Sequence, residues 1–310
     1  MAHQVESMFF VRDVPWHQLG TKVENALCSS EALKAASLDW DVVQKPILTS
    51  DFMPVQGYRA NIRSTDQKVL GVVTDRYKVV QNHEAFQFTD DLLGEGVVYE
   101  TAGSLQDGKK VWMLARLPQK YQLAGDEVCP YLVFSNCHDG SGGIRVAITP
   151  IRIVCCNTLN LALSSAKRMW STIHTGDINK KLDEAKKTLM LAEFYMEKLT
   201  TEAESLSRIK VSDNKVKEYI EMLIPMPDEP SQLQESNVKV LRFNLQRSYF
   251  KAPDLDLMPK NAWRLINAVS DFATHSKPLR QTANYKENLF MKTVEGNPLI
   301  DKAYELVKAI

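Results

Sequence analysis

The stretch over residues 131–163, YLVFSNCHDGSGGIRVAITPIRIVCCNTLNLAL, constrains the fold of this chain more than any other. It contains the longest apolar run and the densest cluster of glycines in the sequence. Residues 131–136 and 144–156 are rich in residues that favour strands, and the turn-forming DGSGG lies between them. The pattern therefore predicts a β-hairpin. We expect a short helix to follow, capped by Asn157 and running through Leu163.

The sequence before this hairpin predicts an antiparallel sheet with helices packed on it. A polar STDQ turn and an Asp-Gly turn separate pairs of strand-like segments. Asn82 is the expected cap of an amphipathic helix that covers the sheet, and residues 29–36 predict another helix. The expected strands lie within residues 57–73, 75–80, 97–105 and 110–117. Strands interspersed with helices in this way indicate an α+β fold.

The clearest periodicity in the chain predicts a long heptad helix after the sheet. Apolar residues follow a 4,3 spacing through four heptads, about 40 Å of helix at 1.5 Å per residue. Such a stripe needs a partner, which could be the sheet, a later helix of the same chain, or a second subunit. A homo-oligomer through residues 178–206 is therefore one of the open alternatives. The stripe consists of Ile178, Leu182, Ala185, Leu189, Ala192, Met196, Leu199, Ala203 and Leu206.

The rest of the chain predicts a helical C-terminal region. The proline-rich PMPDEP at residues 225–230 is the best candidate for a linker. We therefore divide the chain into an α+β sheet domain (1–175), the long helix with the helix after it (176–224), and a helical C-terminal region (225–310). The expected helices lie over residues 211–223, 238–249, 261–275, 284–293 and 298–310.

Composition and charge limit the classes of function. The chain has 44% hydrophobic and 25% charged residues, as in ordinary globular proteins, and the N-terminus MAHQVESMFF lacks a signal-peptide pattern. No apolar run is long enough to cross a bilayer, so we expect a cytoplasmic protein. The formal net charge is zero, with 15 Lys and Arg against 18 Asp and Glu in residues 1–163 and 23 against 20 afterwards. Any nucleic-acid-binding surface must therefore be local.

Cysteine and histidine chemistry is the enzymatic alternative. Cys137 and His138 precede the DGSGG turn, and Cys155 and Cys156 lie across the predicted hairpin. Neighbouring residues on a strand point to opposite faces, so at most one of each pair can face a common zinc site. The odd total of five cysteines in apolar contexts favours reduced core thiols. We therefore expect neither a metal nor another cofactor, and no catalytic residue is assigned.

Cations beside aromatic residues point to nucleic-acid binding. A single strand is bound by Lys and Arg along a groove, with aromatic faces on which bases stack. The alternative is that these residues have ordinary structural roles, in which the cations pair with acids or lie on solvated strands and the aromatic residues fill the core. The candidate residues are Arg59, Arg63, Lys109, Lys110, Arg145, Arg152, Lys167 and Arg168, with Tyr58 and Trp170 as stacking rings.

Five segments of the chain together resemble a family of phage and plasmid-like proteins named only as a domain of unknown function, the family numbered nine hundred and thirty-two. The resemblance implies a bacterial host cell and a role in DNA metabolism or in dealing with the host. The passage YKVVQNHEAFQFTDDLLGEG also resembles the Rad52-type single-strand annealing proteins at the level of fold pattern. The five segments are PWHQLGT, TDRYKVVQN, KKVWMLARLP, SNCHDGSGGIRVAITPIRIVCCNTLNLAL and AWRLINAVSDFATH.

Two functional hypotheses follow. The first is non-enzymatic binding or annealing of single-stranded DNA in phage or plasmid recombination and replication. The second is a protein-interaction role, such as countering host defence, with the heptad helix as the association surface.

Overall fold

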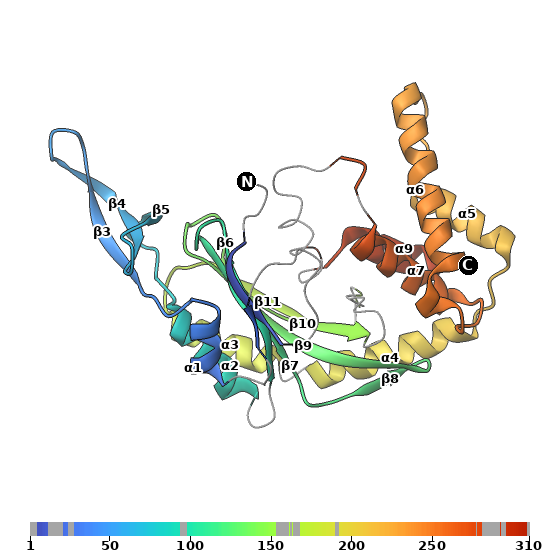
Figure 1. Cartoon of the computed structure of the whole chain (residues 1–310), viewed down its shortest axis with the longest axis horizontal. Helices are drawn as coiled ribbons and strands as arrows, with labels where there is room; N and C mark the ends of the chain where they lie inside the picture. The colour runs from blue at the N-terminus through green and yellow to red at the C-terminus, as the bar shows by residue number, and fades with distance from the viewer. Residues whose placement is uncertain are drawn as a thin grey trace. The chain divides into compact units, whose positions relative to one another are not determined.

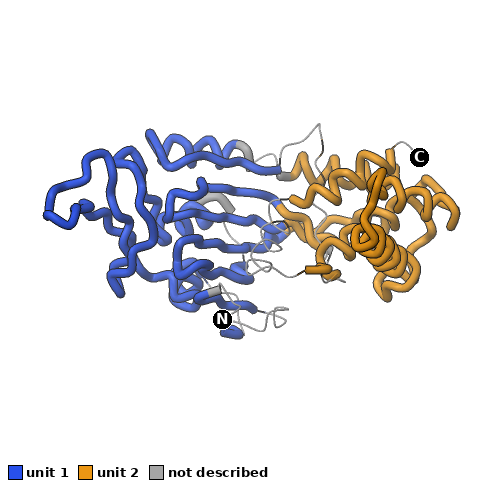
Figure 2. Tube along the Cα trace, turned by 90° about the horizontal axis from the view of Figure 1, so that it is seen from above, with its two compact units in different colours: residues 1–118, 131–148, 168–192 blue, residues 119–130, 149–167, 193–310 orange. Residues whose placement is uncertain are grey.

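The computed structural model describes residues 5–11, 21–23, 28–93, 98–152, 161, 163, 168–189, 192–276, 278–280, 292 and 296–308. The chain divides into two compact units that alternate along the sequence (Figure 2). Unit 1 comprises residues 1–118, 131–148 and 168–192, and unit 2 comprises residues 119–130, 149–167 and 193–310. The units are interleaved, whereas the division predicted from the sequence follows the chain in order. The mixture of helices and antiparallel strands confirms the α+β class.

Among the described residues, eight strands form one sheet in the order β11-β10-β9-β7-β6-β1-β2, with β8 paired to β9 (Figure 1). Strand β1 pairs in parallel with β2 and antiparallel with β6. The β6-β7 hairpin about the Asp-Gly turn is confirmed, as is the pairing of β9 with β10 about DGSGG. The strands are β1 Val5–Phe10, β2 Thr21–Lys22, β6 Val98–Leu105, β7 Lys110–Arg116, β8 Tyr121–Leu123, β9 Asp126–Cys137, β10 Ile144–Arg152 and β11 Met169–Thr172.

Helices α1 (Ser29–Ala35) and α2 (Asn82–Leu93) belong to unit 1, and α2 packs on the large sheet through aromatic rings. Phe86 stacks on Tyr99 of β6 with ring centroids 5.5 Å apart, and Phe88 lies 6.1 Å from Phe134 of β9. These four rings are buried. Each such ring removes roughly 150–250 Å² from water, so this contact contributes strongly to the core.

A separate three-stranded sheet, which we call the arm, projects from unit 1 (Figure 1). Its strands are β3 Val42–Leu48, β4 Pro54–Arg63 and β5 Val69–Thr74. The two strands expected within 57–73 are confirmed, whereas β3 was not expected. The strand expected at 75–80 is wrong, because Tyr77 N donates to Thr74 O in a turn and Lys78 N makes a single bond to His174 O. That segment joins no ladder among the described strands.

Glycines permit two close backbone contacts in unit 1. A Cβ on Gly71 of β5 would lie 2.5 Å from Asp139 Cα, and one on Gly103 of β6 would lie 2.3 Å from the carbonyl oxygen of Ser7. The first contact seats the arm against the β9-β10 turn, and the second allows β1 to pair with β6. A strand glycine commonly marks such an approach.

The Gly103→Ala variant is expected to lose about 1–3 kcal/mol of unfolding free energy, the usual cost of overpacking. The new methyl would force β1 away from β6, because its nearest neighbour is backbone oxygen. Urea unfolding followed by circular dichroism measures the loss. Gln122→Ala, at an exposed position of β8, is the control. Equal unfolding midpoints for Gly103→Ala and the wild type would contradict this account.

The predicted heptad range contains two described helices, α3 Ile178–Leu189 and α4 Ala192–Arg208. Residues 190 and 191 lie outside the described residues, so one continuous helix is not confirmed. Met196, Leu199 and Ala203 are each no more than 1% exposed, and Tyr195 Oη donates to Leu161 O at 3.0 Å. This part of the stripe is therefore buried within its own chain, which removes it as a free association surface.

Unit 2 contains a group of helices with regular caps. Ser212 and Asn261 cap α5 and α7 through their side-chain oxygens, and Tyr219 of α5 donates to Ala303 O of α9 at 2.7 Å. The PMPDEP segment connects α5 to α6 inside this unit. No helix among the described residues is long and apolar enough to cross a bilayer. The elements are α5 Asp213–Leu223, α6 Gln232–Lys251, η1 Pro253–Leu255, α7 Ala262–His275 and α9 Pro298–Val307.

Three sequence expectations fall on residues that are not described. They are the helix capped by Asn157, in which only Leu161 and Leu163 are described, the PWHQLGT segment, and most of the helix expected at 284–293. Leu161 and Leu163 are buried.

Candidate nucleic-acid interface

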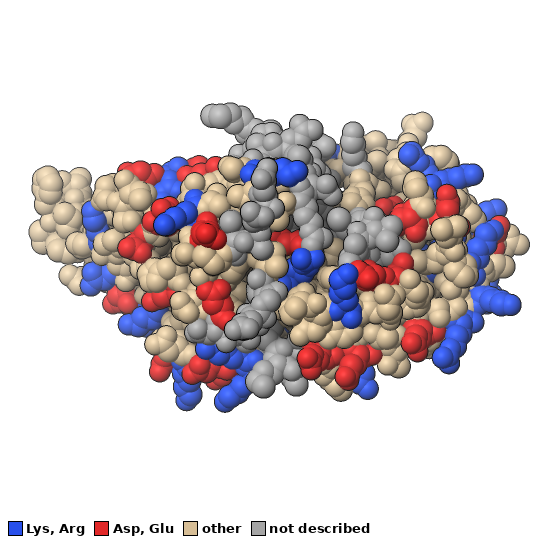
Figure 3. Space-filling model, turned by 60° about the horizontal axis from the view of Figure 1, so that its bottom comes forward, with Lys and Arg blue, Asp and Glu red and all other residues tan. Residues whose placement is uncertain are grey.

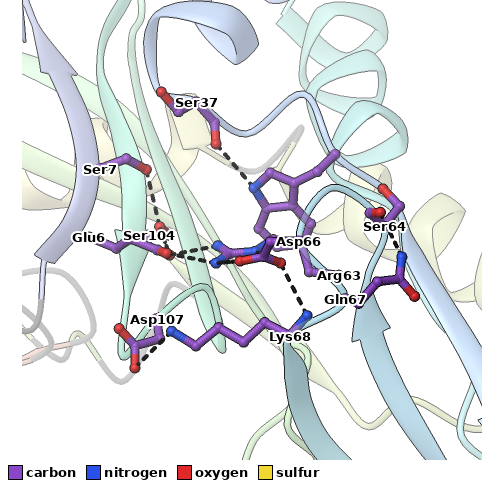
Figure 4. A network of polar contacts seen from close by, with 11 residues as sticks. Glu6, Ser7, Ser37, Arg63, Ser64, Asp66, Gln67, Lys68, Ser104 and Asp107 are labelled. Carbon is purple, nitrogen blue, oxygen red and sulfur yellow. Dashed lines mark hydrogen bonds and ion pairs between the residues drawn. The ribbon is translucent and has the colours of Figure 1, made fainter.

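Arg63 is bound by two carboxylates in unit 1 (Figure 4). Its guanidinium donates to both oxygens of Glu6 at 2.8 Å, and to those of Asp66 at 2.9 and 2.7 Å. It also lies 5.4 Å from the ring centroid of Trp40. Glu6 belongs to β1 and Arg63 ends β4, so this network joins the arm to the large sheet. Arg63 therefore serves the fold, and we leave it out of the interface.

The surroundings of Arg63 are unfavourable for a phosphate. Its hydrogen bonds lower the pKa of Asp66 to about 2, so that carboxylate stays charged at neutral pH. The margin of the network holds Lys68, which pairs with Asp107 at 3.1 Å (Figure 4). Three carboxylates thus oppose two cations, and the local charge is negative.

The other predicted residues of the arm face in different directions. Tyr58 and Arg59 are both exposed on β4, and Tyr58 is 51% exposed. Arg59 is level with Pro46 and Val73, whereas Tyr58 is level with Thr74. Because successive residues of a strand point to opposite faces, the ring and the guanidinium do not share a surface.

The predicted residues of β10 and β11 are also divided between two faces. Arg145 is level with Ser171, and Val146 is level with Trp170. Arg168 precedes β11 by one residue, and its carbonyl accepts from Ile148 N, so it continues the Trp170 face. Arg145 therefore lies on the face opposite to Arg168 and Trp170.

The remaining predicted cations are at other places or are not described. Lys109 and Lys110 are half-buried at the β6-β7 turn, where Lys110 is level with Leu105 and Cys137. Lys167 and the side chain of Arg152 lie outside the described residues. The described members of the predicted set are thus spread over the arm, a hairpin and two sheet faces, and they do not form one positive track.

The Cys137 and His138 pair is part of the fold. His138 is fully buried, and its Nε2 lies 3.0 Å from Asn82 Oδ1. Cys137 is half-buried, and its carbonyl accepts from Tyr77 Oη at 2.6 Å. Cys155 and Cys156 lie outside the described residues. No group of three His, Cys, Asp or Glu side chains among the described residues could hold a metal ion.

Charges of both signs are interspersed over the face shown in Figure 3. One local exception is a cleft of about 780 Å³ in unit 2, which we call the basic cleft. It is lined by Ser207, Arg208, Lys210, Val211, Ser212, Lys215, Pro259, Lys260 and Asn261.

Backbone hydrogen bonds hold the two walls of the basic cleft. Residues 207–212 connect α4 to α5, and residues 259–261 lead into α7. Val211 N donates to Lys260 O at 3.1 Å, and Asn261 Nδ2 donates to Ser207 O at 3.0 Å. The cations therefore lie on two segments that hydrogen bonds hold together, and such a rigid support is suited to positioning a ligand.

Three cations of the basic cleft are available to a ligand. Arg208, Lys210 and Lys215 have exposed side chains that make no ion pair or side-chain hydrogen bond with the described residues. Lys260 is instead neutralised by Asp213 at 2.8 and 3.1 Å, and it lies 5.6 Å from the ring centroid of Phe250. The cleft therefore carries a local charge of about +3, which suits it to a polyanion.

A second cleft, in unit 1, has a different character. It has a volume of about 560 Å³ and lies between α1, α2 and α3. Its one lysine, Lys186, is opposed there by the carboxylates of Glu84 and Asp183. The negative charges exceed the positive one, so this cleft is unsuited to a polyanion.

Sequence reasoning missed the basic cleft because every cation that it proposed lies within residues 59–168. The available signal was local: residues 208–217 contain Arg208, Lys210, Lys215 and Lys217 with a single acid, Asp213. The C-terminal half also carries the net positive charge. Lys260 is distant in sequence, and only folding brings it to the same cleft.

Comparisons with known proteins give one result. The family model described as Domain of unknown function (DUF932) matches residues 69–292, most of the chain. Searches of curated proteins and of solved structures found no match. The similarity to Rad52-type annealing proteins therefore stays a prediction. The match does establish membership: this chain belongs to the DUF932 family, a domain of unknown function.

Proposed function

We propose that this protein binds single-stranded nucleic acid in the basic cleft, as a non-enzymatic component of phage or plasmid DNA metabolism. The observation that carries the proposal is the convergence of Arg208, Lys210 and Lys215 on one cleft without carboxylate partners among the described residues. A phosphate backbone is the ligand that a row of free cations binds best.

The proposal moves the interface from the strands to the helical unit. Arg63 is excluded by its carboxylates, whereas Arg59, Lys109, Lys110, Arg145 and Arg168 are supplementary candidates that lie outside the basic cleft. A stretch of backbone inside the basic cleft can reach three cations that have no carboxylate partner among the described residues, whereas the other described candidates are spread over the arm, a hairpin and two sheet faces.

The test is a salt titration with fluorescently labelled single-stranded DNA of mixed sequence, read by anisotropy. In the triple variant Arg208→Ala, Lys210→Ala and Lys215→Ala, the slope of log K against log salt is expected to fall by about 2, since each phosphate contact contributes about 0.7. Affinity at 0.1 M salt then falls by about 100-fold.

The matched control is Lys180→Ala, Lys187→Ala and Lys217→Ala, which removes the same charge from exposed positions outside the basic cleft. This control is expected to keep the wild-type slope within a few tenths. An equal loss in both triple variants would show that only net charge matters, and absence of salt-dependent binding by the wild type would end the proposal.

A further inference from the structure

The arm carries an unusual exposed apolar surface on its outer face. Val43, Ile62 and Val69 are level with one another across the three strands, and Lys45, Ala60 and Val72 form the next row. Alternation places these rows and Tyr58 on the same face. Val43 is 43% exposed, Val69 53% and Val72 58%. The tip of the arm adds Leu48, Phe52 and Met53, which are 49%, 82% and 63% exposed.

The other surfaces of the arm are partly occupied. On its inner face, Asn61 donates to His138 O at 2.7 Å and Arg63 binds Glu6, although Arg59 is exposed there. The β5 edge meets the β9-β10 turn, where Gly71 approaches Asp139. The β3 edge is interrupted by Pro46 and a register shift, devices that prevent strand addition. The outer face and the tip are therefore the apolar surfaces that the arm offers to a partner.

The exposed area has the size of a protein interface. The exposed fractions of Val43, Tyr58, Val69 and Val72 on the outer face amount to about two whole residues, and those of Leu48, Phe52 and Met53 at the tip amount to about two more. At roughly 150–200 Å² for each residue, the face and the tip together expose roughly 600–800 Å². A standard interface buries about 800 Å² on each partner, whereas the largest apolar patch of a typical monomer is about 300–600 Å².

Helix α6 provides an internal comparison. Its exposed apolar residues, Leu233, Val240 and Phe243, are 71%, 41% and 63% exposed, which is less than two whole side chains. The resulting area, roughly 350 Å², is ordinary for a monomer. The arm is therefore the stronger candidate for a docking surface.

We infer that the outer face and the tip of the arm pack against the same surface of a second copy of this chain. The rows of the outer face consist largely of β-branched residues, so two copies related by a two-fold axis can stack as sheets about 10 Å apart. In the two rows, Lys45 is the one charged position, and Gln67 holds its ammonium at 2.7 Å. Two such faces meet with little charge repulsion, and a charged partner would gain nothing there. This inference is independent of the proposed nucleic-acid binding.

The test is size-exclusion chromatography with light scattering on the full chain from about 1 to 100 μM, a range that brackets common dimer affinities. The wild type is expected at twice the chain mass of 35.1 kDa, and Val72→Glu at that mass itself. Val69→Lys is expected to behave as Val72→Glu does. Both positions are exposed, so circular dichroism should be unchanged.

Leu233→Glu, which places a charge on the exposed face of α6, is the control and is expected to remain dimeric. A wild type that is monomeric at every concentration would overturn the inference and leave the face to a different protein. A Val72→Glu chain that dimerises as the wild type does would overturn it equally.

Discussion

The Arg264→Met variant is expected to lose about 2–6 kcal/mol of unfolding free energy, because each of two buried acceptors left unsatisfied costs about 1–3 kcal/mol. Arg264 lies in α7 and is 5% exposed. Its guanidinium donates to Tyr249 O at 2.8 and 3.1 Å and to Met258 O at 2.6 Å. The variant would leave these two carbonyl acceptors without their donor.

The position of Tyr249 explains why a cation is suited to this site. Tyr249 lies in the last turn of α6, where backbone carbonyls lack helical partners and the helix dipole is negative. Arg264 also lies 5.0 Å from the ring centroid of Tyr249, which adds a cation–π contact. The residue thus fixes the start of α7 against the end of α6.

Chemical denaturation followed by circular dichroism at 222 nm, a wavelength that reports helix content, measures the loss. Arg264→Lys is expected to fall between the wild type and Arg264→Met, because an ammonium keeps the charge but loses the planar fork. Arg247→Met, at an exposed position of α6, is the matched control and is expected within about 0.5 kcal/mol of the wild type. A small loss in Arg264→Met would mean that this contact does not hold the two helices together.

Acidification from pH 7 to pH 4 is expected to cost the folded state about 3 kcal/mol through His138 alone. Burial is the main cause that lowers the pKa of His138 to about 3, and the neighbouring His174 lowers it further, whereas Asp139 opposes the shift. Burial also lowers the pKa of His174, with Lys181 acting in the same direction, and the hydrogen bond to Lys78 O acting against it. Both rings are therefore neutral in the folded protein.

Hydrogen bonds identify the nitrogens that would have to accept the proton. Asn82 Nδ2 donates to Leu38 O, so its Oδ1 accepts, and His138 Nε2 must carry the hydrogen. His174 Nδ1 likewise donates to Lys78 O. The free lone pairs are on His138 Nδ1 and His174 Nε2, which are buried without hydrogen-bond partners in the described structure. Protonation would place a charge on a buried atom with no acceptor.

The direction of the pH effect follows from linkage. The folded pKa of His138 lies below the unfolded value of 6.5. At a pH between these two pKa values, His138 is protonated in the unfolded chain but not in the folded chain. The contribution of His138 to the unfolding free energy is fully present above about pH 6.5, and it falls by about 1.4 kcal/mol per pH unit down to about pH 3. His174 adds a loss of the same sign.

Urea unfolding at pH 7, 5.5 and 4 tests this expectation. His138→Gln keeps an N–H donor for Asn82 but cannot titrate, so its stability should fall by about 3 kcal/mol less than that of the wild type. His83→Gln, at an exposed histidine, is the control and should follow the wild type. If the unfolding free energies of the wild type and of His138→Gln changed equally with pH, His138 would not be the group that makes stability depend on pH.

Local sequence signals predicted the elements that depend on neighbours in the chain. The β6-β7 hairpin follows from an Asp-Gly turn between alternating strands, and the helices expected over 211–223 and 261–275 are present as α5 and α7. Elements that depend on distant partners were missed. Strand β1 pairs with β6 almost a hundred residues later, and β3 is stabilised by β4 in a sheet of its own.

The candidate interface was the least predictable part of the molecule. The sequence shows that Arg63 and Lys210 are both cations, but it does not show which of them meets a carboxylate. Glu6 lies far from Arg63 in the chain, and Lys260 lies about as far from Lys210. Charge compensation is a property of pairs in space, so the free cations could be identified only after folding.

By itself, the sequence determined the α+β class, the hairpins about glycine-containing turns, the helical C-terminal region and membership of the DUF932 family. These depend on turn chemistry, apolar periodicity and motif order, all of which are local in the chain. The tertiary structure alone decided that the chain forms two interleaved units, that the arm leaves an apolar face uncovered, and that a basic cleft forms where residues 207–215 meet 259–261. Burial and the pairing of charges arise from contacts between distant segments, and local sequence patterns do not determine which distant segments meet.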